Sequence, residues 1–371
     1  MGEIQSRPLY LSVKAPIEVE FQNSRVRSNE DSIRIHRFHK WLGVLKRLFV
    51  LVRQKNSWSP LVLAGELWRY LINLGMRREV LRLLKLRPFA EITQNSPAFA
   101  FKYLAPDYLA KGFKGNEGSS CFLHHYRRIH SALPEGVLRQ ILQGSITLHE
   151  IAEGGNRFVL ALGLSEPIGD KEGELSLELQ VDGRKVFNLS FTVVPGWAVK
   201  SPAAEILLIT RIQGAKGSLS QLRLARKAFH EFIPSKVLFA ALTGIADALG
   251  ICELRAICAT RQRAYSKKDA ATLKRNYDDF FVHLGMTVTT DGFYSISVPI
   301  EDRPLASIKG RNRSRARKRR AIRRQIRLAC AAFFLGAADR TAESSSNTVN
   351  STPFPGTVES RLSPIFSQTA D

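Results

Sequence analysis

A short apolar run near the middle of the chain, residues 206–210, constrains the fold more than any other stretch. Its β-branched and long apolar side chains are typical of a buried strand, and a turn and a helix follow it. Gly214 and Gly217 allow turn conformations that side chains disfavour, and Ser218 or Ser220 is placed to cap the helix. Such a strand, turn and helix direct backbone amides towards an anion. The pattern is equally typical of a plain structural turn, and both interpretations stay open here.

Composition favours a folded protein with a sizeable core. The chain has 371 residues, of which 44% are hydrophobic, and this suits one large domain or two ordinary ones. Its four cysteines include no C-x-x-C pair and no spacing typical of zinc ligands. They are Cys121, Cys252, Cys258 and Cys330. We therefore expect neither a metal site nor a disulfide framework. The absence of a disulfide pattern also indicates a reducing compartment.

The sequence also carries information on location and partners. Residues 1–19 lack the basic segment followed by an apolar segment that marks a secretory signal. The longest apolar runs are too short, or too often interrupted by polar residues, to cross a membrane as a helix. We therefore expect a cytoplasmic protein without a transmembrane segment, with peripheral membrane association left open. A net charge of +22 favours an anionic partner, either nucleic acid or acidic lipid headgroups.

The N-terminal part is predicted to be helical. Residues 1–30 mix prolines, polar residues and charges without periodicity, which is typical of a flexible arm. In the helical region predicted at 31–115, apolar residues recur at helical spacing from Ile33 to Leu86, and Ser59-Pro60 is typical of a helix start. Residues from Pro88 onwards are predicted to be irregular or linker-like. The basic faces of these helices are typical of solvated surfaces. A domain boundary is expected between Gly112 and Ser120, where glycine and polar residues are frequent.

Residues 121–308 are predicted to form an α/β core. Three segments in its first half alternate or run apolar as strands do, and Asp182-Gly183 is typical of a two-residue hairpin turn. The central strand, a pair of helices that ends at Gly250, and a further strand at 254–259 follow. This order predicts a mixed, mainly antiparallel sheet with helices packed against it.

A strongly basic segment comes next and is predicted to be a helix at 309–330. From Lys309 to Arg327, eleven of nineteen residues are Lys or Arg and none is acidic. Five arginines are predicted to share one helical face: Arg313, Arg317, Arg320, Arg324 and Arg327. The alternatives are a solvated basic tail and a surface that binds nucleic acid or anionic lipid. Residues 341–371, rich in Ser, Thr and Pro, are predicted to be disordered.

Over half of the chain, from about His124 to Gln325, resembles the VirK/YbjX family of bacterial proteins. The resemblance rests on His125-Tyr126, Glu172-Gly173-Glu174-Leu175, Ile212-Gln213-Gly214, Asn276-Tyr277-Asp278 and the basic run after Ile308. It implies an accessory factor of virulence, envelope remodelling or resistance to cationic antimicrobial peptides. It implies no particular biochemical activity, because the family has none that is agreed.

The predicted order of elements is similar to the GCN5-related N-acetyltransferase fold. In that fold the turn after the central strand follows the pattern Arg/Gln-x-x-Gly-x-Gly/Ala and holds the pyrophosphate of coenzyme A. Arg211 and Gly214 match its first two defining positions, Lys216 stands at the third, and Gly217 comes one place late. The resemblance implies a donor site at these four residues and Gln213. A similar fold in peptidoglycan-peptide transferases uses an aminoacyl-tRNA, so a coenzyme A thioester and an aminoacyl-tRNA both stay open.

The sequence thus predicts an α+β protein with a helical N-terminal region, an acetyltransferase-like sheet, a basic helix and a disordered tail. For function it predicts a VirK/YbjX-like accessory protein with acyl- or aminoacyltransferase activity at the turn 211–218. The candidate acid–base residues are Glu172, Glu174, His125 and Asp278, each of which also has a structural interpretation. The alternative is a non-catalytic module whose basic surface binds nucleic acid or anionic lipid.

Overall fold

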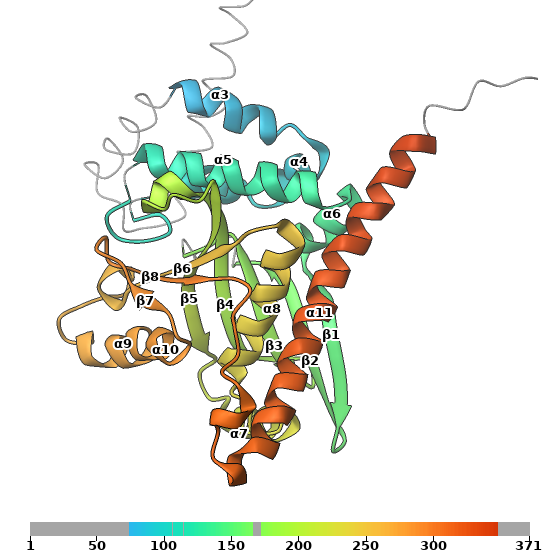
Figure 1. Cartoon of the computed structure of the whole chain (residues 1–371). Helices are drawn as coiled ribbons and strands as arrows, with labels where there is room; N and C mark the ends of the chain where they lie inside the picture. Colours follow the sequence, from blue (N-terminus) through green and yellow to red (C-terminus); the bar gives the residue numbers. More distant parts are fainter. Residues whose placement is uncertain (1–73, 106, 114, 166–171, 348–371) are drawn as a thin grey trace, which may run out of the picture. The chain divides into compact units, whose positions relative to one another are not determined.

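An eight-stranded mixed sheet and nine α-helices make up the described part of the chain, which is an α+β protein as predicted (Figure 1). The structure is a computed structural model that describes residues 74–105, 107–113, 115–165 and 172–347. All of them belong to one compact unit. The predicted arm, the helices predicted before residue 74 and the tail after residue 347 lie outside the described residues.

The strand order is β1-β2-β3-β4-β5-β6-β8-β7, and of the neighbouring pairs described only β5 and β6 run parallel. The bounds are β1 (Ser145–Glu153), β2 (Asn156–Leu164), β3 (Leu175–Val181), β4 (Arg184–Pro195), β5 (Glu205–Gly214), β6 (Glu253–Ile257), β7 (Thr287–Val288) and β8 (Phe293–Ser297). The sheet is therefore mixed and mainly antiparallel, as the sequence predicts.

The α-helices are α3 (Leu74–Leu83), α4 (Arg87–Asn95), α5 (Gly115–Ala132), α6 (Glu135–Gln143), α7 (Leu219–Ala228), α8 (Pro234–Leu249), α9 (Ala270–Asn276), α10 (Asp278–His283) and α11 (Gly310–Asn347). Four short 3-10 helices join them: η1 (Pro97–Leu104), η2 (Gly196–Val199), η3 (Ala259–Arg261) and η4 (Leu305–Ser307). No helix within the described ranges is long and apolar enough to cross a membrane.

Two boundaries differ from the sequence predictions. The expected domain boundary between Gly112 and Ser120 falls on α5, which begins at Gly115 and packs on β4 in the same unit as the sheet. The basic helix predicted to end at 330 continues to Asn347, into the segment predicted to be disordered. The alanines that follow residue 328 favour helix strongly, which explains the extension.

The predicted hairpin turn at Asp182-Gly183 and the predicted glycine end of α8 are confirmed. Asp182 and Gly183, between β3 and β4, both have positive φ, 49° and 77°, as a type I′ hairpin turn requires. Helix α8 starts with Pro234, and Gly250 ends it in the left-handed conformation with φ of 68°. These residues set the hairpin register and the length of the crossover helix.

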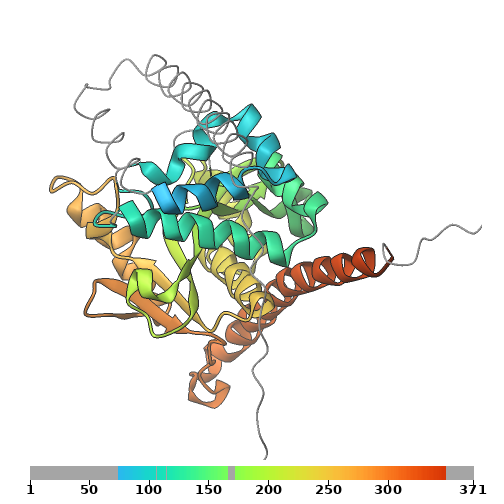
Figure 2. The same ribbon diagram turned by 90° about the horizontal axis from the view of Figure 1, so that it is seen from above.

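The helices cover the sheet in a way that places α8 at the centre of the packing. Helix α8 contacts β3 and β4, α6 contacts β1 and β2, and α5 contacts β4. Of the 16 residues of α8, 13 are buried. Helix α11 lies along α8 and reaches β1 (Figures 1 and 2). The first four residues of the predicted central strand, 206–209, are fully buried in β5.

A glycine and an ion pair hold α11 against α8. Gly244 has so little space that an added Cβ would collide with the backbone carbonyl of Arg327 and lie 3.1 Å from its Cα. One turn along α8, Asp247 accepts two hydrogen bonds from the Arg327 guanidinium, of which the Nη2 to Oδ1 bond is 2.9 Å. The two helix backbones therefore approach closely at this point.

Replacing Gly244 with alanine tests this close approach. A Gly→Ala change inside a helix ordinarily stabilises by about 1 kcal/mol. We expect G244A to destabilise instead, by about 1–3 kcal/mol, because the helices must move apart. Gly136→Ala in α6 is the matched control, since nothing lies within 4 Å of an added Cβ there. Urea unfolding measures both, and equal stabilisation by the two variants would contradict the packing argument.

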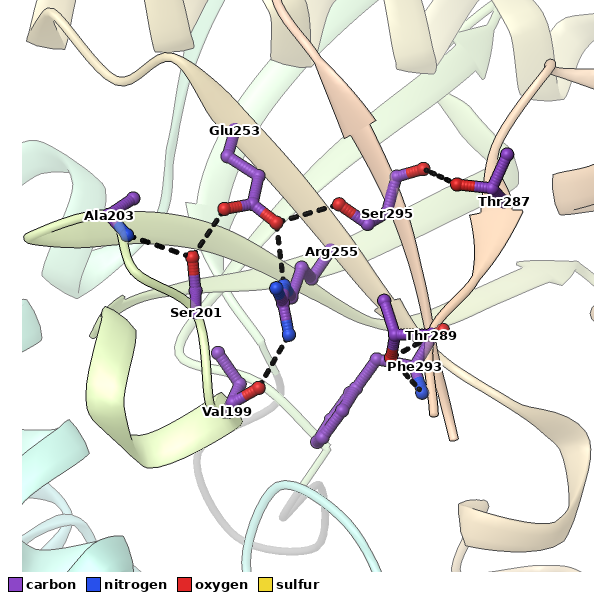
Figure 3. Close-up of polar contacts among 9 residues, drawn as sticks. All are labelled: Val199, Ser201, Ala203, Glu253, Arg255, Thr287, Thr289, Phe293 and Ser295. Atoms are coloured by element: carbon purple, nitrogen blue, oxygen red, sulfur yellow. Dashed lines mark hydrogen bonds and ion pairs between the residues drawn. The ribbon is translucent and has the colours of Figure 1, made fainter. Parts of the chain in front are cut away.

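A second polar cluster braces the connection between β4 and β5 against β6 and β8 (Figure 3). The Arg255 Nε donates to Glu253 Oε1 at 2.6 Å, and its Nη1 donates to the carbonyl of Val199 at 2.6 Å. Ser201 and Ser295 also donate to the Glu253 carboxylate, the latter at 2.6 Å. Burial alone would raise the pKa of Glu253, but the hydrogen bonds from both serines and from Arg255 lower it. Every member of this cluster thus has a partner.

The lowered pKa of Glu253 predicts an acid-sensitive contribution to stability. The contribution is present above the ordinary pKa of 4.5 and is lost as pH falls through the lower folded-state pKa. We expect Glu253→Gln to reduce the free energy of unfolding at neutral pH by about 1–3 kcal/mol, and this difference to shrink below about pH 4. Denaturant unfolding across pH measures it, with the exposed Glu301→Gln as control. If the stability difference between the protein and Glu253→Gln does not change with pH, the lowered pKa of Glu253 is contradicted.

Candidate functional site

Strand β5 has a different extent of pairing on its two sides. It pairs with β4 from Glu205 to Gly214, but with β6 only from Leu207 to Ile209. The β4 register shifts between its residues 190 and 191, which leaves Thr210 opposite no β4 residue. An extra residue of this kind is a β-bulge, and it bends the strand that contains it. Beyond Ile209, β5 therefore turns away from β6.

A cleft of about 710 Å³ opens where the two strands diverge. Its wall consists of the end of β5, Phe187 of β4, Glu172 before β3, Ser235 in the first turn of α8, the loop after η3, and the α9–α10 region. The loop and helix residues in the lining are Gln262, Ala264, Leu273, Arg275, Asn276, Tyr277 and Phe280. A pocket of this size and mixed lining suits an extended small-molecule ligand.

Hydrogen bonds connect the polar groups of the cleft with the bulge at Thr210. Thr210 Oγ1 donates to the carbonyl of Glu172 at 2.7 Å, and the Gln262 amide donates to the carbonyl of Thr210 at 3.2 Å. Arg211 Nε donates to Gln213 Oε1 at 2.8 Å and lies 3.8 Å from the Glu172 carboxylate. Arg275, which is exposed, makes no ion pair with any described residue. The cleft thus contains two guanidinium groups, one carboxylate and several amides.

A family model described as "Protein of unknown function (DUF535)" matches residues 67–332. The chain belongs to this family. It is the domain of the VirK/YbjX proteins, so the family resemblance is confirmed. The match includes α3 to α6 and most of α11. The N-terminal helices and the basic helix therefore belong to the DUF535 domain together with the sheet. No curated protein and no solved structure matches the chain, and the acetyltransferase-like prediction therefore rests on topology alone.

The predicted donor-binding residues of the DUF535 domain do not all line the cleft. Arg211, Gln213 and Gly214 line it, whereas Lys216 lines a smaller neighbouring pocket of about 160 Å³ that shares those three residues. Gly217 lines neither pocket. It has φ of 78°, which favours glycine, while an added Cβ at Gly214 would only touch the Phe187 ring at 3.4 Å.

Helix α7 begins at Leu219 with Ser218 at the N-cap position, as predicted, but the predicted capping hydrogen bond is not made. The Ser218 hydroxyl donates to the carbonyl of Ala215 at 2.6 Å, and the Ser220 hydroxyl donates to the side chain of Gln221. Neither hydroxyl accepts from the first amides of α7. The turn closes on itself because Ser218 finds an acceptor three residues back, which is a common competitor of capping.

Among the predicted acid–base residues, Glu174 is fully buried in a hydrogen-bonded network. Tyr108 and Tyr126 donate to its two carboxylate oxygens at 2.6 and 2.5 Å, and Lys102 Nζ lies 3.3 Å from one of them. Burial, and then the charge and hydrogen bonds of Glu174, raise the pKa of both tyrosines well above their usual value. Both therefore stay protonated donors, and the carboxylate is sealed from the cleft.

The Glu174 network anchors the segment that covers the bulge. Lys102 Nζ also donates to the carbonyl of Gly173 at 2.5 Å. Gly173 has φ of 124°, and an added Cβ would lie 2.7 Å from Thr210 Oγ1. This residue must therefore be glycine for the segment to lie on β5. The network holds Glu172 at the edge of the cleft, although Glu174 itself does not line it.

His125 and Asp278 also lie outside the cleft lining. His125 is fully buried, its Nδ1 accepts from the amide of Val193 at 3.0 Å, and burial, followed by the charges of Lys102 and His124, lowers its pKa well below the usual value. Asp278 accepts from the amide of Ala259 at 2.8 Å and so ties η3 to α10. Within the described residues, no group of three or more His, Cys, Asp or Glu could hold a metal ion.

The five arginines predicted to share one face of α11 divide into two groups. Arg327 pairs with Asp247, and Arg320 pairs with Asp302 at 3.5 Å, so both point towards the body of the domain. Arg313 donates to the carbonyl of Ile308 at 2.9 Å but is exposed. Arg317 and Arg324 are exposed and make no ion pair with a described residue. Three of the five arginines, and not all five as predicted, are therefore available to an anionic partner.

Sequence reasoning did not find Gln262, Arg275 and Ala264 as cleft residues. They lie in a loop and a short helix without periodicity, and only the course of the chain after β6 brings them opposite β5. Tyr277 belongs to the stretch Asn276-Tyr277-Asp278 that carries the family resemblance, and the sequence predicts no role for it in the site. A sequence pattern has no signal for such residues, because their role depends on the bulge at Thr210.

The buried Lys102–Glu174 pair predicts a large and coupled effect of mutation. Glu174→Gln leaves Lys102 as a buried cation without its counter-charge, so we expect a loss of about 3–5 kcal/mol in the free energy of unfolding. Adding Lys102→Met should recover part of this loss. A catalytic Glu174 that faced a ligand would instead leave stability nearly unchanged, and additive losses in the double variant would contradict the pairing. Urea unfolding of Glu174→Gln, Lys102→Met and the double variant measures the loss of stability and the coupling.

Proposed function

We propose that this DUF535 protein is an acyltransferase or aminoacyltransferase whose donor lies in the cleft beside β5. The observation that carries the proposal is the bulge at Thr210, after which β5 pairs with no described strand on its β6 side. Backbone groups of an unpaired strand edge can bind an extended ligand that has its own amides. The pantetheine arm of coenzyme A offers such amides, and an aminoacyl ester linked to RNA offers an amino group and an ester carbonyl instead.

The charges around the cleft support a phosphate-bearing donor. Arg211 and Arg275 line the cleft, and Lys216 lies in the adjoining pocket on the turn that leads to α7. Guanidinium groups bind phosphate oxygens in pairs, and the lysine ammonium adds a point charge. Coenzyme A thioesters and aminoacyl-tRNAs both combine phosphates with an activated acyl group.

Acyl transfer to an amine needs a base at the reacting carbonyl. The amine nitrogen forms a bond to the carbonyl carbon, the thiol or the RNA 3′-oxygen leaves, and the proton of the amine must be accepted. We assign this role to Glu172, because its carboxylate lines the cleft whereas Glu174, His125 and Asp278 do not. The resemblance to VirK/YbjX proteins supports an envelope-related acceptor and a role in virulence, envelope remodelling or resistance to antimicrobial peptides.

A thermal-shift titration with acetyl-coenzyme A tests the proposal. At a hundred times its dissociation constant, a ligand adds about 2.7 kcal/mol of stability, which raises the melting temperature by several degrees. Ala264→Trp fills the exposed mouth of the cleft and should abolish this shift. Ala152→Trp on the edge strand β1 is the matched control, since Ala152 is also exposed and does not line the cleft.

The same pair of variants separates the two donor classes and the alternative function. If millimolar acetyl-coenzyme A produces no shift, a filter-binding assay with an aminoacyl-tRNA replaces it. Ala264→Trp would not affect binding of a donor through the basic helix. Only a loss of donor binding in this variant therefore supports the cleft as the donor site. If neither donor binds in a manner that Ala264→Trp weakens, the transferase proposal fails and the non-catalytic binding module takes its place.

A further inference from the structure

The exposed side of α11 carries a pattern that the transferase proposal does not use. Ile326, Cys330 and Phe334 are buried on the opposite side of the helix. Together with the Gly244 contact and the Arg327–Asp247 ion pair, they fix the rotation of α11 on the domain. The side chains on the other face therefore point away from the sheet in a defined direction.

A single stripe on this outer face changes in character along the helix. Residues at spacings of three or four lie on one side of a helix. The stripe opposite the buried face contains Arg313, Arg317, Ala321, Arg324, Leu328, Ala332 and Leu335, all of which are exposed. Its first half is cationic and its second half is apolar. Leu328 is 55% exposed and Leu335 is 53% exposed, so both leucines lack a cover among the described residues.

The charge around the stripe is uncompensated. No Asp or Glu occurs between Arg303 and Ala338. Asp302 and Asp247 pair with Arg320, Arg323 and Arg327 on the inner side, and no described carboxylate pairs with the exposed cations. At the start of α8, burial and the nearby charges of Arg319 and Arg323 lower the pKa of Lys236. Burial is the larger cause of this lowering, and the two arginine charges add to it.

We propose that the outer face of α11 docks on an anionic lipid bilayer. The arginines of the first half lie at the level of the phosphate headgroups, and Leu328 and Leu335 enter the boundary with the acyl chains. Charge complementarity supports an anionic surface, and the two exposed leucines select lipid over nucleic acid. A nucleic acid offers phosphates to the arginines but no apolar surface to cover the two leucines. Binding of single strands relies on aromatic side chains that stack on the bases, and this stripe has no aromatic residue. The inference is independent of the transferase proposal, because none of these residues lines the cleft.

Co-sedimentation of the full chain with vesicles tests the docking surface. The probes are vesicles of phosphatidylcholine alone and of phosphatidylcholine with phosphatidylglycerol, at low and high salt. We expect binding only to the anionic vesicles, weakened by salt. Leu328→Gln with Leu335→Gln should reduce this binding about tenfold or more, because each leucine contributes buried apolar surface. Val282→Gln with Val288→Gln is the matched control, since both valines are exposed on other elements, at 58% and 66%.

A parallel titration with a single-stranded RNA homopolymer separates the two anionic partners. Arg317→Gln with Arg324→Gln should weaken binding to vesicles and to RNA alike, since both attract the cations. The leucine double variant should bind RNA as the unchanged protein does. Docking on lipid is overturned if anionic vesicles do not bind, or if the leucine variant binds them undiminished. RNA binding without vesicle binding would identify α11 as a nucleic-acid surface. Thermal unfolding of every variant verifies that the fold is retained.

Discussion

Strand β5 is the constraint on which the rest of the domain depends, because it has an antiparallel neighbour on one side and a parallel neighbour on the other. A parallel neighbour requires a crossover connection, which α7 and α8 supply. That crossover brings α8 onto β3 and β4, where it is buried almost throughout. The bulge at Thr210 then ends the parallel pairing and opens the cleft. The helix layer and the cleft are thus two consequences of how one strand is paired.

The parts of this arrangement with strictly local causes were predictable from sequence. The Asp182-Gly183 turn and the Gly250 cap are backbone requirements that glycine satisfies wherever it occurs. The central strand is apolar along its length, and therefore it was recognised as buried. Strand β1, in contrast, has mostly exposed or half-buried residues at the edge of the sheet, and its register shifts near Thr147. Its sequence has no sustained alternation, so its pairing with β2 could not be predicted.

The site was harder to predict, since its residues meet only in the folded domain. Glu174 was singled out with Glu172, yet the two carboxylates, two residues apart, have opposite environments: Glu174 accepts from Tyr108 and Tyr126 in the interior, whereas Glu172 lines the cleft. Their difference comes from Gly173, whose positive φ lets the chain lie on Thr210. No periodicity in the sequence encodes this. Similarly, the arginines of the basic segment were assigned to one face by helical spacing alone, which does not reveal that Asp247 and Asp302 engage two of them.

Helix α8 lies between the cleft and α11, and its packing decides whether binding at one of these two sites can alter the other. Ser235 in its first turn lines the cleft, and Gly244 and Asp247 hold α11 two to three turns later. Transmission of a signal between two sites requires an element with two alternative arrangements. Helix α8 offers none among the described residues, because nearly all of its side chains are buried and the Gly244 contact leaves α11 no room to shift inwards. A bilayer bound at α11 would therefore orient the cleft and concentrate the protein near membrane-bound acceptors, without altering the affinity of the cleft for its donor.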